Sequence, residues 1–78
     1  MDRELQTYYE ERFGMMGSQG WAQFLEDIQA IKDTISIEGL ASAEQLWFAK
    51  GQLDIINWVL NLKVASEKAY EELNAEDI

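Results

Sequence analysis

The chain has 78 residues, with 6 Lys or Arg against 15 Asp or Glu and a net charge of −9. It contains no His, no Cys and no Pro, which excludes disulfides, metal sites built on Cys or His, and nucleophilic catalysis by a Ser/His or Cys/His pair. Direct nucleic-acid binding is also unfavourable, because the phosphates would meet an acidic surface.

The small size of the chain bounds its organisation. Residues 1–78 suffice for one small domain, and 47% of them are hydrophobic, which is too many for a disordered acidic tail. The core of such a domain supplies only a few kcal/mol of net stability, so a disulfide, a bound metal or an oligomeric contact is usually needed as well. Since disulfides and zinc are excluded, we expect oligomerisation or docking on a larger partner instead.

Two features of the sequence bear on its location. The N-terminus is charged and is not followed by the apolar segment of a secretory signal. The densest apolar stretch, Leu53 to Leu62, contains three polar residues and is shorter than the about 20 residues of a transmembrane helix. We therefore expect a cytoplasmic protein without a membrane partner.

Glycine breaks divide the chain and predict three helices. Three glycines lie within residues 14–20, and Gly39 lies in a second break. The first predicted helix covers about residues 2–13, with Asp2 as its N-cap. Its apolar residues recur at every fourth position and so share one face. They are Leu5, Tyr9 and Phe13.

The second predicted helix covers about residues 19–35, with Ser18 as its N-cap. Its apolar residues follow a spacing of three and four, and its charged residues fill the opposite side. This pattern is typical of an amphipathic helix with one buried stripe. The stripe consists of Trp21, Phe24, Leu25, Ile28, Ile31 and Ile35.

The third predicted helix covers about residues 43–73 and starts at a capping box, with Ser42 as the cap and Gln45 reaching back. A helix of about 30 residues would be about 45 Å long, which is unusual for so small a domain. We allow for a break or bend near Asn61, although no proline requires one.

This third helix is apolar around most of its circumference between Leu46 and Ala65. A helix that packs on one partner needs an apolar arc of only roughly 100°. Two explanations are open: the first two helices cover different sides of the third, or another chain covers part of it. We favour the second, because soluble monomers rarely expose large apolar patches. The continuous polar line is limited to Lys50, Asp54, Asn57 and Asn61.

The candidate interface residues lie along this helix. Gly51 costs about 1 kcal/mol relative to Ala, so it is either a tolerated defect or a point of close approach by another helix. Trp58 is either an interface anchor or ordinary core. The candidates are Trp47, Phe48, Gly51, Ile55, Trp58, Val59 and Leu62.

The expected fold is all-α, as a helical hairpin or three-helix arrangement with a long C-terminal helix. The predicted core combines the apolar faces of the three helices. It consists of Leu5, Tyr9, Phe13, Trp21, Phe24, Leu25, Ile28, Ile31, Ile35, Leu46, Ala49, Leu53, Ile56 and Leu60.

No arrangement of residues predicts catalysis. Carboxylates occur in adjacent pairs such as Glu10-Glu11 and Glu26-Asp27, and adjacent residues of a helix point in different directions. We therefore expect solvated acidic faces, no enzymatic activity, and neither a cofactor nor a metal. The acidic end from Glu67 to Ile78 predicts a frayed, solvated terminus, or alternatively a tail that docks into a basic groove.

The segment Phe48–Ile56, together with Gly20-Trp21 and Glu26-Asp27-Ile28, resembles short helical proteins encoded among the structural genes of tailed bacteriophages. The resemblance covers roughly Trp21 to Leu73. It implies a non-enzymatic virion or assembly accessory, associated with a capsid or connector, in the host cytoplasm or in the virion. It identifies no functional residues.

Two functional hypotheses follow. The leading one is an interaction protein that self-associates or docks on a larger assembly through the third helix. The alternative is an acidic inhibitor that mimics phosphate charge in the nucleic-acid groove of a host enzyme, because the chain is small and carries a net charge of −9.

Overall fold

The computed structural model describes residues 1–76, and those residues form four α-helices and no strand. The helices are α1 (Arg3–Met16), α2 (Gln19–Thr34), α3 (Ala43–Leu60) and α4 (Leu62–Glu76). The predicted all-α class is therefore confirmed. The predicted terminus is helical in α4 as far as Glu76 and not frayed from Glu67 onward, while Asp77 and Ile78 lie outside the described residues.

The three predicted N-caps are present. The side chains of Asp2, Ser18 and Ser42 each accept a hydrogen bond from the backbone N–H three residues ahead, at 2.8, 3.1 and 3.2 Å. The side chain of Gln45 also reaches back as predicted, but it accepts from the backbone N–H of Ala41 at 2.9 Å, one residue before the cap. These bonds satisfy N–H groups that a helix leaves unpaired at its start.

The first helix is longer than predicted. It continues through Gly14 to Met16, and it ends at Gly17, whose backbone N–H donates to the carbonyl of Phe13 at 3.0 Å. The prediction of an end at Phe13 was wrong because a single glycine lowers helix propensity without breaking the helix. The extension places Met16 at the junction of α1 and α2, where it is buried.

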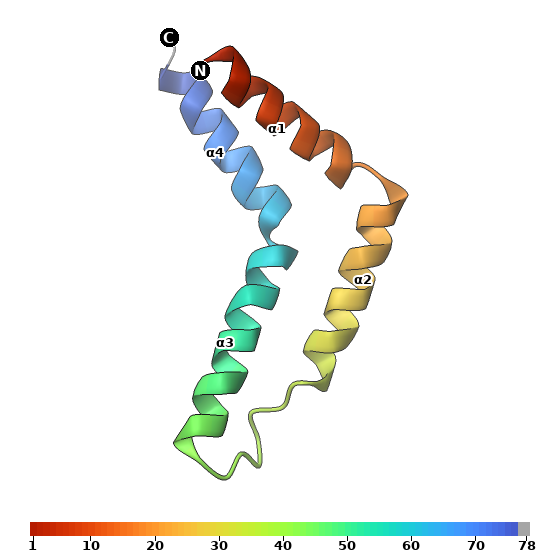
Figure 1. The fold of residues 1–78 in the computed structure, drawn as a ribbon, viewed down its shortest axis with the longest axis vertical. Coiled ribbons are helices and arrows are strands. Elements are labelled where there is room, and N and C mark those ends of the chain that lie inside the picture. The colour runs from red at the N-terminus through yellow and green to blue at the C-terminus, as the bar shows by residue number, and fades with distance from the viewer. Residues whose placement is uncertain (77–78) are drawn as a thin grey trace.

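The long C-terminal helix is not confirmed, and the break for which the sequence allowed near Asn61 is present. Residues 43–73 do not form one helix, since α3 and α4 are separated by the single residue Asn61 and run in different directions (Figure 1). The side-chain amide of Asn61 donates to the carbonyl of Asn57 at 2.7 Å, and the backbone N–H of Asn61 donates to the same carbonyl at 3.0 Å. A polar side chain that competes for a helix carbonyl in this way accounts for a bend without proline.

The four helices form a bent hairpin. α1 packs against α4 and α2 packs against α3, so the start of α1 lies beside the end of α4 (Figure 1). The first two helices therefore cover successive lengths of the returning arm and not different sides of one helix. This pairing leaves much of the apolar circumference of α3 uncovered by its own chain.

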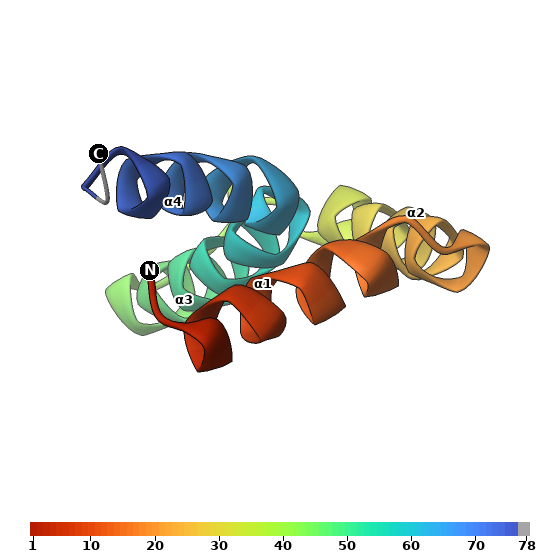
Figure 2. The same ribbon diagram turned by 90° about the horizontal axis from the view of Figure 1, so that it is seen from above.

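The hairpin is elongated and thin. Its Cα atoms extend over 53 × 28 × 15 Å, and the thin direction runs vertically in Figure 2, which looks along the longest axis. The radius of gyration is 16.7 Å, whereas a compact chain of this length has about 11.5 Å. Stable domains usually bury a core between two packed layers, whereas each helix of this hairpin contacts only two of the other three.

The core is accordingly small. The buried residues are Met16, Ala49 and Ser66, of which only Ala49 was predicted. The predictions for Phe24, Ile31 and Leu46 were wrong, since these side chains are exposed. Each helix is covered from one side only, so most of the predicted core residues are half-buried. The half-buried members are Leu5, Tyr9, Phe13, Trp21, Leu25, Ile28, Ile35, Leu53, Ile56 and Leu60.

Candidate interaction surface

The helix α3 has a covered side and an uncovered side. Ala49, which is buried, and Leu53, Ile56 and Leu60, which are half-buried, recur at helical spacing on the side that faces α2. Because each residue advances by about 100° around the helix, a second group of residues lies roughly opposite. We call this group the outer face of α3. It consists of Trp47, Phe48, Gly51, Ile55 and Trp58.

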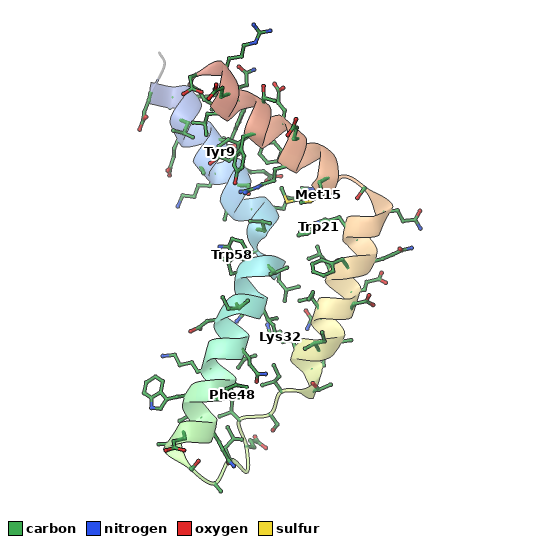
Figure 3. The ribbon with its side chains drawn as sticks, viewed as in Figure 1. Tyr9, Met15, Trp21, Lys32, Phe48 and Trp58 are labelled. Atoms are coloured by element: carbon green, nitrogen blue, oxygen red, sulfur yellow. The ribbon has the colours of Figure 1, made fainter. Side chains whose placement is uncertain are left out.

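The bulky side chains of the outer face are far more exposed than those of an ordinary core. The exposed fractions are 64% for Trp47, 71% for Phe48, 66% for Ile55 and 60% for Trp58. Phe48 and Trp58 lie in the two halves of α3 in Figure 3. The structure thus places five of the seven predicted interface residues together on one exposed face.

The other two predicted interface residues lie elsewhere. Val59 is half-buried at the edge of the outer face, and Leu62 is half-buried at the start of α4, beyond the break at Asn61. The break explains the difference for Leu62, because the prediction assumed one continuous helix. Neither residue belongs to the exposed face.

The outer face is continuous with an open apolar groove of about 640 Å³ between α2 and α3. The groove includes Ile31 of α2 and Ile35, which follows the end of α2, and from α3 it includes Phe48, Gly51 and Ile55. Ile31 is half exposed, at 52%. The two isoleucines were predicted only as core, since an amphipathic stripe does not reveal whether a partner helix covers all of it.

Few charges adjoin the outer face. The charged residues of α3 are Glu44, Lys50 and Asp54. Glu44 continues the line of the outer face one turn before Phe48, and Asp54 lies at its edge beside Trp47, so the stretch from Trp47 to Trp58 carries charge only along its margin. The ammonium group of Lys50 lies 5.0 Å from the centre of the Trp47 ring, a cation–π contact that holds both side chains along the edge of the face. Most of the net charge of −9 therefore lies on the other helices.

The opposite end of the hairpin is closed by aromatic contacts between α1 and α4. The ring centres of Tyr9 and Phe13 lie 5.7 and 5.6 Å from that of Tyr70, within the range of favourable edge-to-face pairs. The guanidinium of Arg12 donates to the hydroxyl of buried Ser66 at 3.4 Å. Tyr9 and Phe13 were predicted as core from the sequence, whereas Ser66 and Tyr70 on α4 were not, because their pairing with α1 depends on the bend at Asn61.

Neither a metal cluster nor a membrane span is found in the part of the chain that the structure describes. Residues 1–76 contain no group of three or more potential ligands, counted among His, Cys, Asp and Glu, that could hold a metal ion. Within the same residues, no helix combines the length and the apolar character that crossing a membrane requires.

Comparisons with known proteins identify no relative. No protein-family model matches the chain, and neither a curated protein nor a solved structure does so. The resemblance of Phe48–Ile56 to phage structural-gene products therefore stays a prediction.

Proposed function

We propose that the protein is a non-enzymatic interaction protein that self-associates through the outer face of α3. The observation that carries this proposal is the position of four bulky apolar side chains, 60–71% exposed, on the part of α3 that its own chain leaves uncovered. Keeping apolar surface in water costs about 25 cal/mol per Å². Large exposed apolar patches on soluble proteins therefore commonly mark sites of association.

The total accessible surface of the chain is larger than that of a compact monomer, which supports self-association. The accessible surface is 6081 Å² for a mass of 9.0 kDa. A compact monomer of that mass exposes about 4,900 Å², so the excess is roughly 1,200 Å². A standard protein interface removes about 800 Å² from each partner. Contact with a second copy is sufficient to remove most of the excess.

The distribution of charge favours a second copy as the occupant. Each chain carries a net charge of −9, so two copies repel each other except where their contacting surfaces are uncharged. The stretch of the outer face from Trp47 to Trp58 meets that requirement, because the nearest carboxylates, those of Glu44 and Asp54, lie at its end and its edge. An acidic inhibitor would instead bind through several carboxylates gathered on one face.

The resemblance to phage structural-gene products supports a further proposal about context. A self-associating helical protein of this kind would serve as an accessory to a larger particle or its precursor, in the cytoplasm of the host cell or in the virion. The assembly would then be built from repeated copies of the outer-face contact.

Sedimentation velocity on the isolated protein, at concentrations up to tens of micromolar, tests self-association. We expect a species of at least two chains for the wild type and a monomer for Ile55→Glu. Val64→Glu is the matched control, because Val64 is 67% exposed and Ile55 is 66% exposed, but Val64 lies on α4. A monomeric wild type, or equal loss of association in both variants, would overturn the proposal.

A further inference from the structure

Gly51 lies at the centre of the outer face, and nothing in the conformation or packing of its own chain requires a glycine there. It lies inside the regular helix α3, whereas the positive φ of 82° that favours glycine occurs at Gly39. A Cβ added at Gly51 would meet no atom within 4 Å. Neither the backbone conformation nor the packing of the single chain therefore explains a residue that disfavours the helix.

The absence of a side chain at Gly51 leaves a hollow between bulky neighbours. Trp47 precedes it by one helical turn and Ile55 follows it by one turn, and both side chains are exposed. The apolar groove between α2 and α3 includes Gly51 together with these two residues. The backbone of another helix can approach α3 more closely here than at any bulky position of the outer face.

We propose that α3 of a second copy crosses α3 at Gly51, so that the twofold axis of a dimer passes beside this residue. A symmetric contact uses the same patch on both copies. The outer face suits such a contact because it carries both the hollow at Gly51 and the projecting side chains that would flank the crossing. This inference rests on the self-association proposed above and specifies where the two copies meet.

The area available agrees with a dimer contact centred there. An aromatic or large aliphatic side chain presents about 200 Å² when it is fully exposed. At the observed exposed fractions of 60–71%, the four bulky residues of the outer face contribute roughly 500 Å² per copy. Together with Ile31 and Ile35 in the groove, two copies reach the size of a standard interface of about 1,200–2,000 Å².

Substitution of Gly51 separates its role in folding from its role in association. Gly51→Ala places a methyl group in the crossing and is expected to weaken dimerisation about tenfold or more, although it raises the helix content. Gly51→Leu is expected to abolish the dimer. Gly14→Ala is the matched control, because Gly14 lies inside α1 with no atom within 4 Å of its Cβ position. It is expected to raise helix content without changing dimer affinity.

A disulfide provides a direct measure of the crossing, since the chain contains no cysteine. Under mild oxidation, Gly51→Cys is expected to form a linked dimer much faster than Gly14→Cys. A wild type that stays monomeric would overturn the self-association itself. A wild-type dimer that keeps its affinity in Gly51→Leu, or that links equally fast through both cysteines, would overturn only the crossing at Gly51.

Discussion

Ala49 and Trp58 lie about half a turn apart around α3, because nine residues at about 100° each bring them to opposite sides of the helix. Ala49 is 6% exposed against α2, and Trp58 is 60% exposed on the outer face. Ala49 thus lies on the side of α3 that packs within the chain, and Trp58 lies on the side through which we propose association. Substitutions on the first side are expected to affect the stability of the chain, and those on the second side its oligomeric state.

Trp58→Ala is therefore expected to weaken association without destabilising the dissociated chain. Loss of a tryptophan anchor costs about 2 kcal/mol or more in binding, roughly a thirtyfold increase in the dissociation constant. Because the side chain is largely exposed, the free energy of unfolding of the dissociated chain should change by less than about 0.5 kcal/mol. Sedimentation measures the first quantity, and urea unfolding at low concentration measures the second.

Trp21→Ala is the control for this prediction. Trp21 is half-buried on α2 and its ring lies 5.6 Å from that of Phe24, so its removal should lower the free energy of unfolding by about 1–3 kcal/mol. A Trp58→Ala variant that unfolds as easily as Trp21→Ala and still associates normally would contradict the assignment of Trp58 to an interface.

The sequence was sufficient to predict the features that depend on local chemistry. The caps at Asp2, Ser18 and Ser42 follow from the hydrogen-bonding capacity of their side chains, and the amphipathic stripe of α2 follows from helical spacing. The end of α1 was misplaced because Gly14 is only a weak helix breaker. The caps and the periodicity of a helix depend mainly on neighbouring residues and little on the rest of the chain.

The arrangement of the helices could not be predicted in the same way. The bend at Asn61 depends on a side-chain hydrogen bond to Asn57, and the same two residues would also be compatible with a straight, solvent-exposed helix. The bend decides that α1 meets α4, and hence that Tyr70 contacts Tyr9. Five outer-face residues could be named from the sequence because their apolar character exceeds what one partner helix covers.

The aromatic contacts between α1 and α4 predict a stabilising role for Tyr70 that is separate from association. Tyr70→Ala removes two ring contacts, at 5.7 Å to Tyr9 and 5.6 Å to Phe13. Each such pair is worth about 0.5–1.5 kcal/mol beyond the area it buries, so a loss of about 1–3 kcal/mol in the free energy of unfolding is expected. Urea unfolding of the dissociated chain measures it.

Tyr70→Phe is the conservative variant, because it keeps the ring and both edge-to-face contacts. We expect it to retain most of the stability that Tyr70→Ala loses. If Tyr70→Phe unfolded as readily as Tyr70→Ala, the ring contacts would not be what holds α1 to α4.

The dependence of association on salt distinguishes the two functional hypotheses. Two copies that meet through uncharged outer faces still repel each other through their net charges of −9, and added salt screens this repulsion as the Debye length falls from about 30 Å at 0.01 M to about 3 Å at 1 M. We therefore expect self-association to tighten several-fold when sodium chloride rises from about 0.01 M to about 0.15 M. Sedimentation equilibrium at several salt concentrations provides the dissociation constants.

The opposite dependence is expected of an acidic inhibitor, whose carboxylates would bind a basic groove and lose affinity as salt increases. Self-association that weakens with salt would likewise require oppositely charged surfaces in the contact, whereas the outer face from Trp47 to Trp58 has charges only at its end, at Glu44, and along its edge, at Lys50 and Asp54. Gly51→Leu, measured in parallel, shows how much of the salt response belongs to this contact. If the contact lies at Gly51, the variant should stay monomeric at every salt concentration at which the wild type associates.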